Sequence, residues 1–439
     1  MKESMSSKIL IKNAEIITME RADNGVLAAP FRGNVVVEGC LIKSVSREEA
    51  EGSFDTVIDA DGFVAMPGLI NTHGHAAMAL FRGYADDTDL MSWLNDKIFP
   101  IEDRLRGEDV YNGTMLAVAE MLKSGTTAFA DMYFFMDDTA RAVCESGIRA
   151  SLSQGLTEPD QGAPDKLETA VDFARRLNGA ADGRITTMLG PHAPYTSSPA
   201  YMKRIIDAAT AEKLPLHIHL AETQNETEQI MARYGKRPVA LLAELGLFEN
   251  KVLAAHGVYL NSEEIELLSR YNVSVAHNPR SNMKLASGIA PVAEMLAKGI
   301  NVSLGTDSAC SNNNLDMFQE MRAAALLAKL KNLDPKSLPA AEVLAMATVN
   351  GAKALGIDNL AILRTGYKAD IILVNTRRLH MSPSNDIVSH LVYAASGSDV
   401  DTVIVDGRIL VSGGELLFMD EERIIAAADK SMNCMTGTY

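Results

Sequence analysis

The chain has 439 residues, 47% of them hydrophobic and 22% charged, a composition that excludes a disordered protein and supplies a large apolar core. Its formal charge of −16 argues against nonspecific attraction to nucleic acid or anionic membranes, so we expect a small-molecule partner. Its apolar runs are far shorter than the roughly 20 residues that span a bilayer, its start has no apolar signal region and its four cysteines are far apart, which predicts a cytoplasmic protein with reduced thiols.

In chain order, three segments differ in the secondary structure that their sequences predict. Residues 1–66 hold short β-rich stretches separated by Gly, Asn and Asp turns, and predict the first part of a small β domain. In residues 67–360, apolar strands alternate with amphipathic helical stretches, a pattern that indicates a parallel sheet. Residues 361–439 again predict β-strands, with Asp406-Gly407 as a hairpin turn, followed by a final helix near residues 421–432.

The middle segment contains eight strand candidates. They are residues 68–75, 126–132, 149–156, 185–192, 215–222, 252–258, 273–279 and 302–308. Eight parallel strands with intervening helices close a barrel. The sequence therefore predicts an α/β protein: a (β/α)8 TIM-like barrel that interrupts a small β-sandwich domain formed from both termini.

Histidine is scarce, with nine in the chain, yet seven fall at or near the predicted carboxyl ends of barrel strands, where such barrels keep their active sites. His73 and His75 are one residue apart at the end of the first strand, so both side chains can face one ion. By itself such a pair is more often structural. His219 and Asp307 end two other strands, and three imidazoles with one carboxylate suit zinc or ferrous iron and leave a position for water.

Two further residues near these ligands are candidates for proton transfer. Glu222 lies in the loop after His219, where a carboxylate can move the proton of a metal-activated water, and its alternative is a solvated loop carboxylate. His256 ends the sixth strand and can orient the attacking hydroxide, with direct metal ligation as the alternative. His217 points the same way as His219 and is interpreted as a supporting or packing residue. For His277, at the end of the seventh strand, structural and functional roles remain open.

Several motifs carry a family resemblance along nearly the whole chain. The stretches MPGLINTHGH, HIHLAE, AHGV and LGTDSACSNNN resemble the amidohydrolase superfamily. Within it, residues 67–104 together with ADMY and GPHAPY are similar to the 5-methylthioadenosine/S-adenosylhomocysteine deaminases. The resemblance implies one divalent metal, usually zinc, and hydrolysis of the exocyclic amine of an adenine nucleoside. It also implies that Glu222, His256 and Asp307 are the catalytic groups, and it favours a homo-oligomer.

The same resemblance implies the substrate contacts. Glu102 matches the position that accepts hydrogen bonds from the two ribose hydroxyls, and His192 and Ser311 match positions that touch the nucleoside. Glu222 and Asp307 are expected to contact the purine as well. Trp93, the only tryptophan, is a candidate for stacking on the nucleoside, with a hydrophobic anchor for its loop as the alternative.

The chain departs from the family pattern at the 5′ end of the substrate. Members that act on S-adenosylhomocysteine are expected to hold its carboxylate with arginines near the third strand, where this chain has Gln154 and Lys166. Gln makes no charge-assisted fork with a carboxylate and Lys is a point charge, so we expect an uncharged 5′ group. The alternatives are an amidohydrolase of another amino-heterocycle, such as guanine or a triazine, and an inactive scaffold. The complete ligand set disfavours the scaffold.

Overall fold

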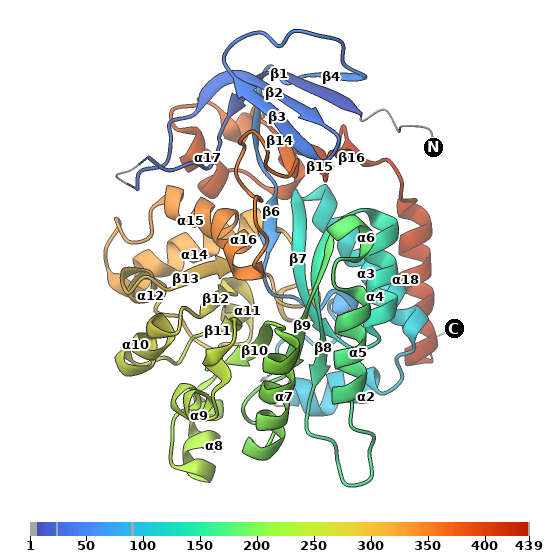
Figure 1. The fold of residues 1–439 in the computed structure, drawn as a ribbon, viewed down its shortest axis with the longest axis vertical. Coiled ribbons are helices and arrows are strands. Elements are labelled where there is room, and N and C mark those ends of the chain that lie inside the picture. The colour runs from blue at the N-terminus through green and yellow to red at the C-terminus, as the bar shows by residue number, and fades with distance from the viewer. Residues whose placement is uncertain (1–6, 23–24, 89–91, 438–439) are drawn as a thin grey trace.

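The computed structural model describes residues 7–22, 25–88 and 92–437, apart from the side chains of residues 93–95. Eight parallel strands form the predicted barrel in sequence order (Figure 1): β6 (Leu69–Asn71), β7 (Thr126–Tyr133), β8 (Arg149–Leu156), β9 (Ile185–Pro191), β10 (Leu216–Leu220), β11 (Val252–His256), β12 (Ser274–His277) and β13 (Asn301–Leu304). The N–H of Thr72 donates to the carbonyl of Leu304 at 2.9 Å and joins the last strand to the first. The predicted barrel is confirmed.

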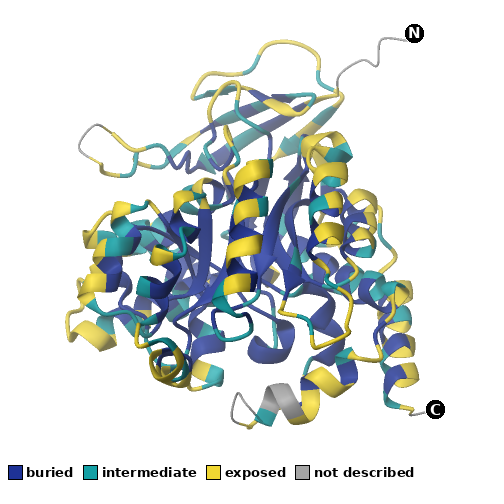
Figure 2. Cartoon of the chain, turned by 60° about the horizontal axis from the view of Figure 1, so that its bottom comes forward, coloured by how far each residue is buried: buried dark blue, intermediate teal, exposed yellow. Residues whose placement is uncertain are grey.

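Helices surround the barrel, and their exposed faces point outward while the strands between them are buried (Figure 2). The elements between the first and fifth barrel strands are η1 (Ala76–Phe81), η2 (Trp93–Ile98), α2 (Phe99–Glu102), α3 (Gly107–Lys123), α4 (Met136–Ser146), α5 (Leu167–Leu177), α6 (Ala180–Gly183) and α7 (Pro199–Glu212). Those that follow are α8 (Gln224–Tyr234), α9 (Pro238–Glu244), η3 (Leu247–Glu249), α10 (Ser262–Arg270), α11 (Pro279–Lys284), α12 (Val292–Ala297), α13 (Ala309–Asn312), α14 (Met317–Asn332), α15 (Ala340–Met346) and α16 (Val349–Leu355).

Both termini contribute to a second β domain, as the sequence predicts, and the strands of the expected β-sandwich are joined in one mixed sheet. Its nine strands are β1 (Lys8–Ile16), β2 (Phe31–Glu38), β3 (Leu41–Ser46), β4 (Thr56–Asp59), β5 (Phe63–Pro67), β14 (Ile371–Asn375), β15 (Val400–Val405), β16 (Arg408–Ser412) and β17 (Glu415–Leu416). The remaining elements are η4 (Leu379–Met381), α17 (Ile387–Tyr393), η5 (Gly397–Asp399) and α18 (Glu421–Thr436). The sheet is mixed, because β14 pairs antiparallel with β5 while β1 pairs parallel with β5. The hairpin expected at Asp406-Gly407 joins β15 to β16.

A buried ion cluster ties this sheet to the barrel. Arg149, the first residue of β8, is 1% exposed and donates to both carboxylate oxygens of Asp370 at 2.9 Å and to Asp406 at 3.0 Å. Because β8 begins at this contact, the terminal sheet covers the amino-terminal end of the strand (Figure 1). The carboxyl end of the barrel therefore stays available for a site.

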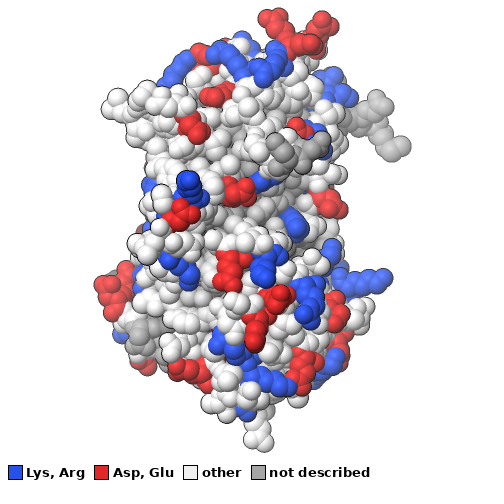
Figure 3. All heavy atoms as spheres, turned by 90° about the vertical axis from the view of Figure 1, so that its left-hand side faces the viewer, with Lys and Arg blue, Asp and Glu red and all other residues white. Residues whose placement is uncertain are grey.

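The final helix is longer than the sequence pattern indicates. α18 runs beside α3, and Asn112 of α3 donates to Ser431 of α18 at 3.1 Å. Among the described residues, no helix has the length and apolarity needed to cross a membrane. On the face shown in Figure 3, acidic and basic side chains are interspersed, without a continuous basic surface.

Candidate active site and metal centre

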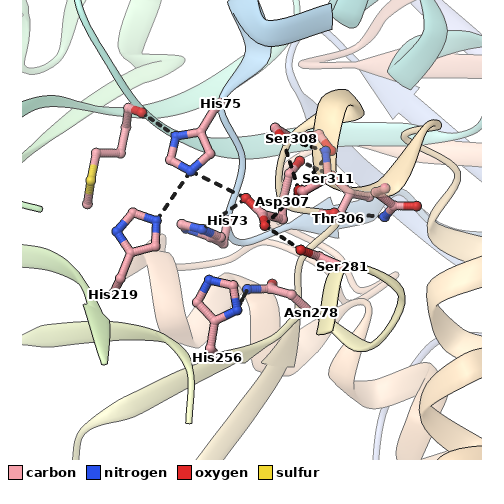
Figure 4. A network of polar contacts seen from close by, with 12 residues as sticks. His73, His75, His219, His256, Asn278, Ser281, Thr306, Asp307, Ser308 and Ser311 are labelled. Carbon is pink, nitrogen blue, oxygen red and sulfur yellow. Dashed lines mark hydrogen bonds and ion pairs between the residues drawn. The ribbon is translucent and has the colours of Figure 1, made fainter. Parts of the chain in front are cut away.

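Four barrel strands place imidazole and carboxylate groups at one mouth. His73 and His75 follow β6, His219 lies within β10, His256 is the last residue of β11, and Asp307 follows β13. Their side chains converge in Figure 4, although they come from segments up to 234 residues apart in the chain (307 − 73). The amino-terminal half of the barrel interior is apolar, with Ile70, Ala128 and Leu253 in one buried cluster, so the polar groups collect at the carboxyl end.

The orientation of three imidazoles is set by acceptors on their Nδ1 atoms. The Nδ1 of His75 lies 2.6 Å from the carbonyl of Met132, that of His219 lies 2.8 Å from the carbonyl of His192, and that of His256 lies 2.9 Å from the Oδ1 of Asn282. Since these oxygens only accept, each Nδ1 carries the hydrogen and each Nε2 faces the cluster. This is the ring orientation that metal-binding histidines take.

His73 is held by another histidine. Its Nδ1 lies 2.8 Å from the Nε2 of His217, whose own Nδ1 lies 3.4 Å from the Oγ of Ser153. The Ser153 hydroxyl in turn donates to the carbonyl of Asp131 at 2.9 Å. His217 thus contacts a proposed ligand from behind, which agrees with its interpretation as a supporting residue.

The inward atoms form a cluster that fits one divalent cation. The Oδ1 of Asp307 lies 3.5 Å from the Nε2 of His73 and 3.3 Å from that of His75, which lies 3.3 Å from the Nε2 of His219. The buried Nε2 of His73 has no hydrogen-bond partner, and ring nitrogens this close need a proton or a cation between them. Two groupings of metal-compatible atoms overlap here: His73 with His75 and His219, and His73 with His256 and Asp307. His256 therefore stays a candidate ligand as well as a candidate orienting group.

The electrostatics of the cluster also favour a cation. Burial lowers the pKa of His73 to about 4 and, with the neighbouring histidines, holds that of His219 well below its ordinary value, so both rings are neutral, the form that ligates metal. Burial acts the same way on His75, but the Asp307 carboxylate outweighs it and raises the pKa of His75 to about 9. The cluster therefore attracts positive charge, which a bound metal would supply.

Asp307 is oriented by two hydroxyl groups. Its Oδ2 accepts hydrogen bonds from Ser281 at 2.6 Å and from Ser311 at 2.8 Å, which leaves Oδ1 toward the histidines (Figure 4). Ser311 also lines the pocket, as its resemblance to a substrate-contacting position implies. Ser281 is a contact that the sequence pattern does not reveal.

The backbone is strained where three strands end. Ala221, His256 and Asp307 have φ values of 53°, 78° and 61°, in the left-handed region that residues other than glycine rarely adopt. Such strain persists where surrounding contacts enforce it, and it is common at functional sites. At these three positions it turns the chain sharply, so that His256, Asp307 and Glu222, the neighbour of Ala221, line the pocket.

Glu222 lies in the same pocket beside His256, with 3.8 Å between its Oε2 and the histidine Nε2. The hydroxyl of Ser287 is 3.4 Å from its Oε1, and burial raises the pKa of Glu222. A carboxyl with a raised pKa holds a proton more readily than an ordinary glutamate, which suits a group that accepts a proton and returns it. The solvated alternative for Glu222 is wrong, because only 8% of the residue is exposed.

The pocket extends from the histidines to Glu102 and His192. Tyr133 donates to the Oε1 of Glu102 at 2.6 Å, and burial raises the pKa of Glu102 to about 7. The side chain of Trp93 lies outside the described part of the structure, so its stacking role stays a prediction.

Three other residues discussed from the sequence, His277, Gln154 and Lys166, are absent from the described lining of the pocket. His277 is buried at the end of β12, and the residues that line the pocket around β8 are Gly155 and Thr157 rather than Gln154. Lys166 has its ammonium 5.1 Å from the ring centre of Phe134, a pocket residue. The sequence pattern missed Asn282 and Tyr133, and Asn282 stands in the SNMK stretch just after β12.

Comparison with known proteins shows the family of this chain. A profile of the amidohydrolase family matches residues 64–410, most of the chain. The chain belongs to the amidohydrolase family. A 5-methylthioadenosine/S-adenosylhomocysteine deaminase of Pelotomaculum thermopropionicum is 52% identical over 427 residues, 97% of this chain and 98% of that protein. The resemblance drawn from the motifs is therefore confirmed.

Other relatives of this amidohydrolase carry related names. A 5′-deoxyadenosine deaminase of Methanosarcina mazei is 52% identical over 425 residues, 96% of this chain and 97% of its own. Among solved structures, an adenosine deaminase from Xanthomonas campestris with bound zinc superposes with a TM-score of 0.93 at 34% identity, covering 98% of this chain and 99% of that one. The amidohydrolase fold is thus shared with a protein that was solved with bound zinc, and together with the His/Asp cluster of this chain this supports a site for one divalent metal.

Proposed function

We propose that this amidohydrolase is a metal-dependent deaminase that converts an adenine nucleoside into the inosine analogue and releases ammonia. The observation that carries the proposal is a pocket with the His/Asp cluster and the half-buried Glu102 carboxylate among its lining residues. One part suits hydrolysis at the purine, and the other suits a pair of vicinal hydroxyls. The names of relatives that match nearly the whole chain support the same substrate class.

We assign the metal to His73, His75, His219 and Asp307, and propose Zn²⁺ as the ion, because imidazole and carboxylate are its usual ligands. Ferrous iron is the alternative. When bound, a divalent ion of this kind lowers the pKa of a water ligand to about 7, so that a nucleophile is available near neutral pH.

The chain's own groups then move the protons. In this proposal the Glu222 carboxylate takes a proton from the attacking water and delivers it to the purine ring nitrogen beside the amino group. His256, whose Nδ1 hydrogen is held by Asn282, presents the Nε2 lone pair and orients the water. Asp307, whose carboxylate is oriented by two serine hydroxyls, receives the second proton, which departs with ammonia.

Recognition of the nucleoside is assigned to the residues that face these groups. Glu102 accepts hydrogen bonds from the ribose hydroxyls, and Tyr133 fixes its carboxylate. His192 and Ser311 contact the nucleoside from the wall of the pocket. Trp93 is proposed to stack on it.

The 5′ substituent is proposed to be uncharged, as in methylthioadenosine, 5′-deoxyadenosine or adenosine. The described lining of the pocket contains no arginine or lysine, while Phe99, Phe134 and Leu285 give it apolar walls. A carboxylate placed against these walls would lose hydration, and Lys166, whose ammonium lies 5.1 Å from the ring centre of Phe134, offers a point charge rather than the two-pronged contact of an arginine. Steady-state comparison tests this point, and a higher kcat/KM for S-adenosylhomocysteine than for the uncharged nucleosides would contradict it.

Ammonia release tests the function as a whole. The zinc-loaded protein is assayed with adenine nucleosides, guanine and an aminated triazine, together with Glu102→Ala. We expect turnover of adenine nucleosides that falls strongly in the variant, since the ribose diol loses its acceptor. Turnover of a free base that is unaffected by Glu102→Ala would instead support the alternative, an amidohydrolase of another amino-heterocycle.

A further inference from the structure

Glu226, in the first turn of α8, is a buried carboxylate that binds the backbone beside the pocket. Its Oε1 accepts the N–H of Ala221 at 2.8 Å, and its Oε2 accepts the N–H of Glu222 at 2.9 Å. Hydrogen bonds to an ionised carboxylate are stronger than those between neutral groups. Glu226 is 2% exposed and is absent from the described lining of the pocket, so its contacts are with the protein rather than with a substrate.

The backbone that it binds is held from a second direction. The carbonyl of Ala221 accepts the N–H groups of Val258 at 2.9 Å and of Tyr259 at 2.8 Å, in the loop after β11. Ala221 has a φ of 53°, which is unfavourable for alanine without support. The turn that carries Glu222 into the pocket therefore depends on contacts from two neighbouring segments.

The start of α8 brings the carboxylate to this position. Thr223 caps the helix, with its Oγ1 accepting the N–H of Glu226 at 3.1 Å. In an ordinary capping box the third helical residue returns to the amide of the cap, as Glu264 does with Asn261 at the start of α10. Glu226 instead reaches the two amides before the cap, which belong to the turn beside the pocket.

We propose that Glu226 is the positioning residue that fixes the backbone of Ala221 and Glu222, and thereby aims the Glu222 carboxylate at the reacting purine. The inference rests on the proposed function, in which Glu222 transfers the proton. Proton transfer requires heavy atoms within hydrogen-bond reach, so a small displacement of the turn lowers the rate of the chemical step while Glu102, His192 and Ser311 still hold the nucleoside.

The kinetic test compares Glu226→Gln with Glu264→Gln. Both replace a buried capping glutamate by its isostere, but Glu264 lies at α10, where its carboxylate binds the Asn261 amide and the Arg237 guanidinium and makes no hydrogen bond to Ala221 or Glu222. Burial raises the pKa of Glu226 to about 7, so the assays are carried out at about pH 8, where most of its carboxyl groups are ionised. We expect kcat for methylthioadenosine to fall about 10- to 100-fold in Glu226→Gln. KM and zinc content should stay within about twofold, and Glu264→Gln should keep the wild-type kcat.

A second measurement tests the contact without turnover. Hydrogen exchange of the Ala221 and Glu222 amides is followed in the zinc-loaded protein without substrate, where we expect faster exchange in Glu226→Gln and no change there in Glu264→Gln. If the wild-type protein deaminates no adenine nucleoside, the proposed function fails. The exchange measurement still shows whether Glu226 holds the amides of Ala221 and Glu222. Wild-type kcat or wild-type protection in a folded Glu226→Gln protein would overturn the proposal. If that variant does not fold, Glu226→Asp, which keeps the charge but shortens the reach, is judged by the same criteria.

Discussion

At the scale of single residues, the carboxyl groups of the pocket have different surroundings, which suit them to different roles. Asp307 lies against histidines and hydroxyl donors, whereas burial raises the pKa of both Glu222 and Glu102. Pairs of titratable groups whose surroundings separate their pKa values mark acid/base assignments in enzymes. Metal ligation by Asp307 and proton transfer by Glu222 are consistent with this separation.

Glu222→Gln tests the proton-transfer role. The amide keeps the size of the side chain but cannot take a proton from water, so we expect kcat to fall by about 10²- to 10⁴-fold. Zinc content should be unchanged, because Glu222 is outside the groups of metal-compatible atoms. Metal analysis beside steady-state ammonia release provides the measurement. Near-normal turnover with full zinc would refute the role.

The raised pKa of Glu102 predicts that nucleoside binding depends on pH. Burial raises its pKa to about 7, so the carboxyl gains a proton as the pH falls through this value and then accepts fewer hydrogen bonds. We expect the KM for methylthioadenosine to rise by about tenfold per pH unit below 7 and to level off above it. The measurement is KM between about pH 5.5 and 8, with 2′,3′-dideoxyadenosine as the control. The same dependence for the dideoxy compound would assign the effect to another group.

At the scale of the elements, strand β10 shows what the alternation of side chains along a β-strand can and cannot predict. Alternation places His217 and His219 on one face of the strand, and both indeed point into the barrel mouth. Alternation does not show that His217 contacts His73, because that contact depends on how β6 and β10 face each other across the barrel. Helix ends depend on closer neighbours in the chain: Ser198, which precedes Pro199 at the start of α7, accepts the N–H of Tyr201 at 3.2 Å.

His217→Leu tests the contact between the two histidines. Without an acceptor for its Nδ1 hydrogen, His73 loses the bond that orients its ring, and such supporting partners typically change metal affinity by about 10- to 100-fold. We expect zinc affinity to fall by that amount in a titration against a competing chelator. His217→Gln, which keeps an acceptor, should recover part of it, and His277→Leu removes a comparably buried histidine as the control. Equal zinc affinity in all three variants would contradict the prediction.

At the scale of the whole molecule, the barrel and the terminal sheet are joined by a buried ion cluster. Arg149 of β8 binds Asp370 and Asp406, residues that lie 221 and 257 positions away in the chain. A buried charge whose partner is removed loses solvation that nothing replaces. The cluster is therefore expected to matter for stability rather than for catalysis, since it lies at the end of the barrel opposite the pocket.

Arg149→Met tests this connection. The buried carboxylate of Asp370 and the half-buried one of Asp406 would lose their shared cation, and we expect a loss of about 3–5 kcal/mol in the free energy of unfolding. Arg175→Met, which removes an exposed pair with Glu212, should leave the denaturant midpoint nearly unchanged. Urea unfolding of the metal-loaded proteins is the measurement, with kcat as a check that the pocket is intact. An unchanged midpoint for Arg149→Met would show that the cluster contributes little.

The sequence by itself determined the barrel, the joining of the termini in a second sheet and the location of the candidate ligands. These depend on local information: the alternation of strands and helices, and side chains placed at strand ends, which a parallel barrel gathers at one mouth. The tertiary structure alone decided which groups support them, as with Asn282 for His256 and Glu226 for the turn before Glu222. The physical reason is that a hydrogen bond depends on atoms within about 3 Å of each other. Spacing along the chain does not reveal that proximity for side chains from different elements.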